Sequence, residues 1–217
     1  MKIGLTVLIA VGLLPSVDVP AVTNNLTLTA VIAREAAMGL ALAFVVRALI
    51  AGVEFAGHLT GFQIGFSYGA TIDPQSGVTN TMLATLYGSL ATLGLLAVNG
   101  HHMLLRALAA SYTGLPIGTG HVDASLVTAV RDILGLVFVV SARLAAPIVI
   151  VLLIVELAVG LISRSAPSLG FMVIDYPIRL MIGLGLLAAL IPTIPAVTTS
   201  MTDAAITIGV RTAAAFR

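Results

Sequence analysis

The stretch GHLTGFQIGFSYG, residues 57–69, has a glycine at every fourth position: Gly57, Gly61, Gly65 and Gly69. Residues four apart stack on one face of an α-helix, so the spacing predicts a helix face that carries no side chains. In an apolar chain, such a face lets the backbone of a second helix approach closely. We therefore predict that these glycines pack against neighbouring helices.

A polar break follows the glycine stretch. Residues 73–77 read Asp-Pro-Gln-Ser-Gly, and Pro and Gly in this arrangement interrupt regular structure. Irregular backbone at membrane depth is tolerated only where protein or water covers it. A close-packed helix followed by such a break favours a packed assembly or a pore lining over a lone membrane anchor. The candidate residues for a channel constriction or plug are Phe62, Gln63, Gly65, Phe66, Gly69, Asp73, Pro74 and Gly77.

The composition is that of a membrane protein. The 217 residues are 59% hydrophobic and 9% charged, and the mean hydropathy is +1.14. A net charge of +1 and the absence of a basic run argue against nucleic acid as a partner. The absence of cysteine excludes disulfides and thiolate metal sites. We predict an all-α, multi-pass helical membrane protein that contacts lipid.

Apolar runs and their interruptions predict the helices. Lys2 and the run that follows it could be a secretory signal, but no convincing cleavage site follows, so a retained short membrane helix is favoured. Pro and Gly mark the breaks, and Pro147 is expected to bend a long helix. The predicted helical segments are residues 3–14, 28–69, 78–98, about 101–112, 122–164, 180–191 and 198–217.

Several charged residues, Arg143 among them, lie inside apolar segments, where each would cost roughly 2.5–3.5 kcal/mol at a membrane helix centre. Two pairs lie one helical turn apart and can interact locally: Glu54 with His58, and Asp175 with Arg179. The remaining charges could form a proton relay or could pair between subunits to fix their register, and the second role is favoured. The residues assigned to buried charges or intersubunit contacts are Arg47, Glu54, Glu156 and Arg164.

A second polar break comprises Asn99, Gly100, His101 and His102, which we interpret as a turn at a membrane boundary. Neighbouring histidines are expected to point in different directions on a helix, so they are poorly placed to share a metal ion.

The other histidines add no metal-binding spacing, and we predict neither a metal nor a cofactor. Ser67 lies in a G-x-S-x-G pattern, but a nucleophile elbow needs a strand before the serine, whereas this one lies in a predicted helix. We therefore predict that the chain is not an enzyme.

Several short motifs occur in a fixed order along nearly the whole chain. They are FQIGF at 62–66, DPQSG at 73–77, NGHHMLL at 99–105, Ser111-Tyr112 with Pro116, Ala146-Pro147, ELAVGLISRSAP at 156–167 and Phe171-Met172-Val173. In this order they resemble the FliR family of flagellar biosynthesis proteins. The NGHH string at 99–102 is more similar to the flagellar branch than to the homologous virulence-type branch.

The resemblance implies a single subunit domain over residues 1–217, built of long, bent and broken helices packed as helical hairpins. It implies a structural and channel-forming role in a hetero-oligomeric type III export gate, through which unfolded export substrates pass. The implied partners are FliP and FliQ as gate subunits, with FlhB and FlhA as further components. The implied location is the bacterial inner membrane, in the flagellar basal body.

The chain departs from the family in one respect, because family members usually carry a further apolar segment before the region that matches residues 2–14. We therefore expect the family's first N-terminal helix to be absent. The alternatives are a virulence-type secretion subunit or a small secondary transporter. A transporter would be expected to contain inverted repeats, and none is evident in the sequence.

Overall fold

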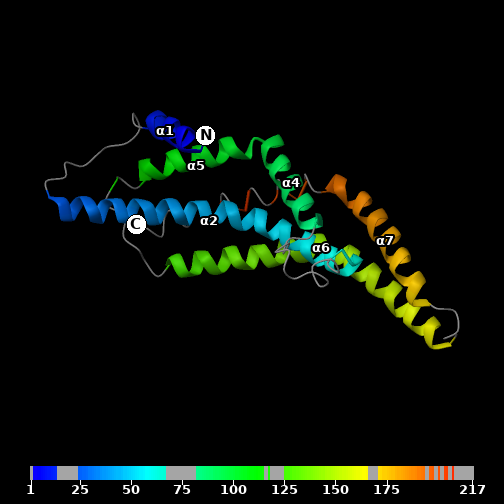
Figure 1. Cartoon of the computed structure of the whole chain (residues 1–217). Coiled ribbons are helices and arrows are strands. Elements are labelled where there is room, and N and C mark those ends of the chain that lie inside the picture. The colour runs from blue at the N-terminus through cyan, green and yellow to red at the C-terminus, as the bar shows by residue number, and fades with distance from the viewer. Residues whose placement is uncertain are drawn as a thin grey trace. The chain divides into compact units, whose positions relative to one another are not determined.

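The computed structural model describes residues 2–13, 24–66, 82–114, 117, 125–165 and 171–193, together with a few isolated positions between 196 and 207 (Figure 1). Every regular element in these ranges is a helix, which confirms the all-α prediction. The elements are α1 (Lys2–Leu13), α2 (Asn25–Ile64), α4 (Met82–Ala97), α5 (Gly100–Gly114), α6 (Ser125–Ser165), α7 (Phe171–Leu190) and the short 3-10 helix η4 (Ile191–Thr193).

Three helices within the described residues are long and apolar enough to cross a membrane. They are α2, α6 from Val127, and a segment from Asp175 to Thr193 that covers most of α7. The pair α4 and α5 qualifies as a fourth span if the two helices are taken together as one broken span. These spans agree with the predicted multi-pass membrane protein.

The chain forms two compact units, each described by itself. The first comprises residues 1–47, 99–134 and 202–217, and the second comprises residues 48–98 and 135–201. In the first unit, Met38 of α2 is buried with Ala37 and Ala41 packed against it. The second unit contains the C-terminal part of α2, α4, the larger part of α6, and α7.

The core of the second unit lies where α2 meets α4 and α6. A Cβ atom on Gly52 would lie 3.3 Å from the Val137 backbone of α6, so the missing side chain lets the two helices approach. Phe55 of α2 packs edge-to-face on Phe138, with ring centroids 6.1 Å apart. Tyr87 of α4 and Thr60 of α2 are both buried in this core.

The α6 and α7 helices, which follow one another in the sequence, form the hairpin visible in Figure 1. The α6 helix continues through Pro147 and ends at Ser165, directly before the predicted terminator Ala166-Pro167. The α7 helix begins at Phe171, whereas the sequence predicted a start near Leu180. The predicted start was wrong, because the helix also includes Pro177 and the polar residues before Leu180, such as Asp175 and Arg179.

The predicted helix over residues 78–98 is confirmed from Met82 onward, and residues 78–81 lie outside the described residues. The described helix is α4, and it ends at Ala97, before a turn in which Asn99 has φ of 56°. Asparagine tolerates this left-handed conformation better than most residues do, because its short side chain forms local hydrogen bonds. The chain resumes as a helix at Gly100, so the polar break is a one-turn interruption between two helices.

Candidate functional site at the end of α2

The C-terminal end of α2 is a glycine-terminated cap. Gly65 has φ of 102°, and Phe66 N–H donates to the Gly61 carbonyl at 2.9 Å. Gly65 N–H donates to the Phe62 carbonyl at 3.1 Å, so both hydrogen bonds of a Schellman motif are present. The cap satisfies carbonyls that the helix end leaves unpaired and turns the chain out of the helix axis. Of the predicted plug residues, Phe62 and Gln63 precede this turn, Gly65 and Phe66 form it, and the others come later in the sequence.

The glycine stretch therefore has two different structural roles. Gly57 lies inside α2, and a Cβ atom there would be 2.7 Å from the Ala84 Cα and 2.8 Å from the Leu83 carbonyl oxygen. Gly61 is buried in the same helix. Gly65 lies beyond the helix end, so the prediction that the helix continues to Gly69 was wrong. Spacing alone cannot distinguish a packing glycine from a terminating one, because both occur at the same interval.

Ile64 anchors the last residue of α2 to α7. Its side chain is fully buried, and a Cβ atom on Gly183 of α7 would lie 2.5 Å from Ile64 Cγ1. The missing side chain at Gly183 is thus the space that Ile64 occupies. This contact fixes the helix end against α7 directly before the Gly65 turn.

A cluster of polar and charged side chains lies beside this anchor. Arg179 of α7 binds Asp175 with a fork of two contacts, Nε to Oδ1 at 2.9 Å and Nη2 to Oδ2 at 2.8 Å. Arg179 Nη2 also lies 3.4 Å from Glu156 Oε1 of α6. Gln63 of α2 donates through Nε2 to Glu156 Oε2 at 3.4 Å. Side chains from three helices therefore meet at the end of α2.

The cluster contains two carboxylates and one guanidinium, so acceptors outnumber cationic partners. The Gln63 amide compensates in part, because it donates to Glu156 without adding charge. Arg179 is mostly buried, whereas half of the Glu156 side chain is exposed. Loss of the Glu156 charge would leave the Arg179 guanidinium with the Asp175 carboxylate alone. Loss of the Arg179 charge would leave the two carboxylates without a cation between them.

The pairing of Asp175 with Arg179 confirms the sequence prediction, but the connection to Glu156 and Gln63 was missed. A usable signal exists, because Glu156 precedes the end of α6 by about nine residues and Arg179 follows the start of α7 by about eight. Residues equidistant from the turn of an antiparallel helical hairpin lie at similar heights. Gln63 carries no comparable signal, since its meeting with Glu156 depends on how α2 packs on the hairpin.

The other plug candidates are only partly described. Phe62 is 72% exposed on α2, and Phe66 is half-buried in the turn. Gly69, Asp73, Pro74 and Gly77 lie outside the described residues, as do Ser67 and His121. The assignment of the plug candidates to a channel plug stays a prediction.

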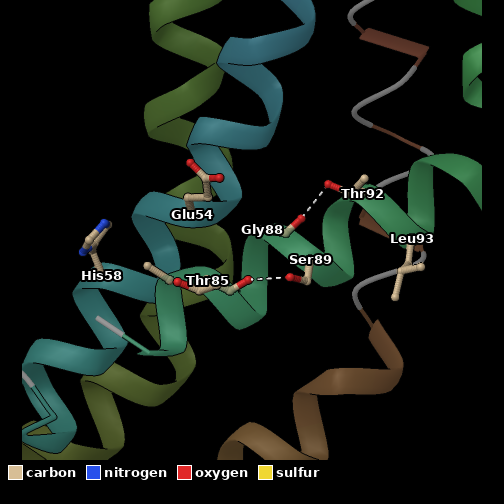
Figure 2. A pocket seen from close by; sticks show the side chains of 8 residues that line it. Glu54, His58, Thr85, Gly88, Ser89, Thr92 and Leu93 are labelled. Carbon is tan, nitrogen blue, oxygen red and sulfur yellow. Dashed lines mark hydrogen bonds between the residues drawn. The ribbon is translucent and has the colours of Figure 1, made fainter. Parts of the chain in front are cut away.

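The remaining charged candidates lie in different parts of the chain. Arg47 and Arg164 are exposed, and Glu54 is half-buried beside α4. Figure 2 shows Glu54 and His58 on α2 lining one pocket with Thr85 and Ser89 of α4. Contacts of Arg47, Glu54 and Arg164 with other subunits stay a prediction.

The second polar break is a tight turn at the start of α5. The Asn99 carbonyl accepts hydrogen bonds from the His102 N–H at 3.0 Å and the Met103 N–H at 3.3 Å. The His101 and His102 rings lie 4.2 Å apart and 36° from parallel. The prediction that the two rings point in different directions was therefore wrong. Within the described residues, no group of three or more His, Cys, Asp or Glu residues could hold a metal ion.

Together these observations define a multi-pass α-helical membrane protein in which polar side chains from three helices fix the end of one span. The model of the family described as bacterial export proteins, family 1, matches residues 1–205. The chain belongs to this family, which confirms the resemblance found in the sequence motifs.

Individual relatives agree with the family. The flagellar biosynthetic protein FliR of Escherichia coli K12 is 34% identical over 197 residues, which cover 89% of this chain and 75% of that protein. The FliR protein of Bacillus subtilis is 30% identical over 150 residues, covering 68% of this chain and 58% of that protein. The Yop proteins translocation protein T of Yersinia pestis is 30% identical over 173 residues, which cover 74% of this chain and 65% of that protein.

Proposed function

We propose that this chain is a structural and channel-forming subunit of a type III protein export gate, and that it is not an enzyme. The similarity to FliR proteins over most of the chain carries this proposal. The flagellar system is favoured over a virulence system, because the E. coli FliR protein is more similar to the chain than the Yersinia translocation protein is. Its role would be to help assemble the flagellum by passing unfolded substrates.

The proposed partners are FliP and FliQ in the gate, with FlhB and FlhA as further components, in the inner membrane at the basal body. Much of the exposed surface of the α6–α7 hairpin is apolar, which supports its contact with partner subunits or lipid. Large apolar side chains are exposed along both helices, among them Ile154, Leu157 and Leu161 on α6 and Met181 on α7. Exposed apolar surface on this scale is typical of membrane contact or subunit contact.

Within the gate, we propose that residues 65–77 form part of a channel constriction or plug whose root is the end of α2. The Gly65 cap, the Ile64 contact with Gly183 and the Gln63 contact with Glu156 support this proposal, because they fix the point from which the segment departs. A movable plug needs a fixed root if it is to close the same channel after each opening. Deleting a few residues between Tyr68 and Gly77 should make cells leaky to small ions. Unchanged ion permeability in an assembled complex would contradict the plug.

The gate itself is tested by co-purification. The chain would be tagged after Arg217, expressed with its genomic neighbours, and purified in mild detergent, and every bound protein would be identified by mass. A stable complex with several copies of two small helical membrane proteins is the expected result. A single-chain particle obtained with those neighbours present would instead favour the transporter alternative.

A further inference from the structure

A groove separate from the charge cluster lies between α2 and α4, lined by both polar and apolar residues. Its volume is about 550 Å³, and it opens to the surface. Glu54 and His58 of α2 form one wall, and Ser89 and Thr92 of α4 form the other (Figure 2). Leu93 adds an apolar end. The groove therefore combines a charged part, a hydroxyl part and an apolar part on two membrane helices.

The lack of a side chain at Gly88 lets the Glu54 side chain of α2 pack against α4. A Cβ atom on Gly88 would lie 2.9 Å from both Glu54 Cγ and Glu54 Oε1. The carboxylate therefore occupies space that any other residue at position 88 would fill. As a result, one carboxylate oxygen lies beside the hydroxyl-bearing face of α4.

Two hydroxyl groups of this face, those of Ser89 and Thr92, already donate their protons within α4. Ser89 Oγ donates to the Thr85 carbonyl at 2.9 Å, and Thr92 Oγ1 donates to the Gly88 carbonyl at 2.8 Å (Figure 2). A hydroxyl has one proton to donate and two lone pairs that accept. Both side chains therefore present only acceptors to the groove. Such hydroxyls repel anions and attract hydrogen-bond donors.

The Glu54 carboxylate also presents acceptors. It already takes part in an interaction within the chain, but a carboxylate has about four acceptor positions and no donor. Among the lining residues, His58 and the Thr85 hydroxyl can supply a proton to an acceptor. A lining so rich in acceptors fits a group that only donates, and the side chains of that kind are the lysine ammonium and the arginine guanidinium.

One wall of the groove belongs to α2, which qualifies as a membrane span, and the other to α4, which qualifies only together with α5 as a broken span. This position favours a basic side chain over a free ion as the source of the cation. A free ion would lose its water shell there, whereas a basic side chain on a helix is delivered at a fixed depth. Lysine and arginine also place an apolar stem below a charged head. Leu93, which is 62% exposed, suits the stem, and Glu54 with Ser89 suits the head.

We propose that this groove, lined by Glu54, Ser89 and Thr92, receives a lysine or arginine side chain from a helix of a neighbouring membrane subunit. The proposal rests on the proposed function, because a neighbouring subunit must exist. It adds to that function a specific docking site and the chemistry of its partner.

The chain contains no cysteine, so Ser89→Cys provides a single thiol inside the groove. That thiol would be labelled with benzophenone maleimide in the chain expressed with its genomic neighbours. After irradiation of the purified complex, cross-linked peptides would be identified by mass spectrometry. The expected product is a membrane-helix peptide of another subunit that contains lysine or arginine close to the cross-link.

Variants of Glu54 and Gly88 test whether the carboxylate holds the basic side chain of the neighbouring subunit. Glu54→Gln should weaken retention of that subunit about tenfold, because a charge-assisted hydrogen bond is replaced by a neutral one. Gly88→Ala should weaken it as well, by displacing the carboxylate without removing it. Glu35→Gln is the matched control, the same change on the same helix outside the groove, and should retain the subunit as the unchanged chain does.

The outcomes separate the two proposals. If the unchanged chain binds no other membrane protein, the export-gate function fails, and this inference fails with it. If the complex is intact but the thiol at position 89 cross-links only lipid, detergent or this chain, the docking site alone is wrong. A cross-link to a helix without a basic residue would also overturn it, as would equal retention by Glu54→Gln and Glu35→Gln.

Discussion

Arg179 lies between two carboxylates on different helices, with Nη2 2.8 Å from Asp175 Oδ2 on its own helix and 3.4 Å from Glu156 Oε1 on α6. One guanidinium thus joins the two arms of the α6–α7 hairpin. Through Glu156 it also reaches Gln63, which lies two residues before the Gly65 turn. The hairpin and the end of α2 are therefore linked by a single chain of polar contacts.

Replacing Arg179 by Met should destabilise the assembled protein more than Glu156→Gln does. The first change leaves two carboxylates close together without a cation, whereas the second leaves the Asp175 fork intact. We expect losses of about 1–2 kcal/mol for Arg179→Met and below about 1 kcal/mol for Glu156→Gln, because Glu156 is half exposed. The measurement is the fraction of complex that survives heating in detergent.

The double variant provides the control for this prediction. Adding Glu156→Gln to Arg179→Met should recover part of the lost stability, because it removes one of the two facing carboxylates. Strict additivity of the two losses would show that the residues do not interact. A proton relay predicts instead that Glu156→Gln abolishes export while leaving the thermal stability unchanged.

The sequence predicted the local half of this cluster and missed the rest for a physical reason. Asp175 and Arg179 are one turn apart, so helix geometry alone brings them together. Glu156 meets Arg179 only because α6 and α7 pack as a hairpin that sets the height of one helix against the other. Gln63 meets Glu156 only through the packing of α2, which the glycines permit without specifying its register.

Gly57→Ala should be strongly destabilising, while Gly39→Ala on the same helix should not. A methyl group at position 57 would lie 2.7 Å from the backbone of Ala84, which cannot move without shifting α4 away from α2. Position 39 has no atom within 4 Å of the added methyl group. We expect Gly57→Ala to cost about 1–3 kcal/mol and Gly39→Ala to stabilise the helix by up to about 1 kcal/mol. Thermal survival of both variants measures the difference, and equal survival would contradict the close α2–α4 packing.

Gly65→Ala tests the cap at the end of α2. Its φ of 102° is strained for any residue with a Cβ atom, so alanine there should cost about 1–3 kcal/mol. Gly160→Ala in α6 is the control, because an added methyl group meets nothing within 4 Å. If the cap is the root of a plug, Gly65→Ala should also raise ion leakage in cells, whereas Gly160→Ala should not. If Gly65→Ala lowers stability without raising ion leakage, the cap is supported, but its role in closing a channel is contradicted.

The meeting of Ile64 with Gly183 can be tested by exchanging side-chain volume between the two positions. Gly183→Ala alone should be destabilising, because its methyl group would lie 2.5 Å from Ile64 Cγ1 and 2.8 Å from Cδ1. Ile64→Ala alone removes a fully buried side chain and should cost about 2–5 kcal/mol. In the double variant the new methyl group enters the space that Ile64 vacates, so the combined loss should be smaller than the sum by about 0.5–3 kcal/mol. Thermal survival of the four proteins completes the cycle. A coupling of zero would mean that the end of α2 is not held against α7, and the fixed root of the proposed plug would then depend on the polar cluster alone.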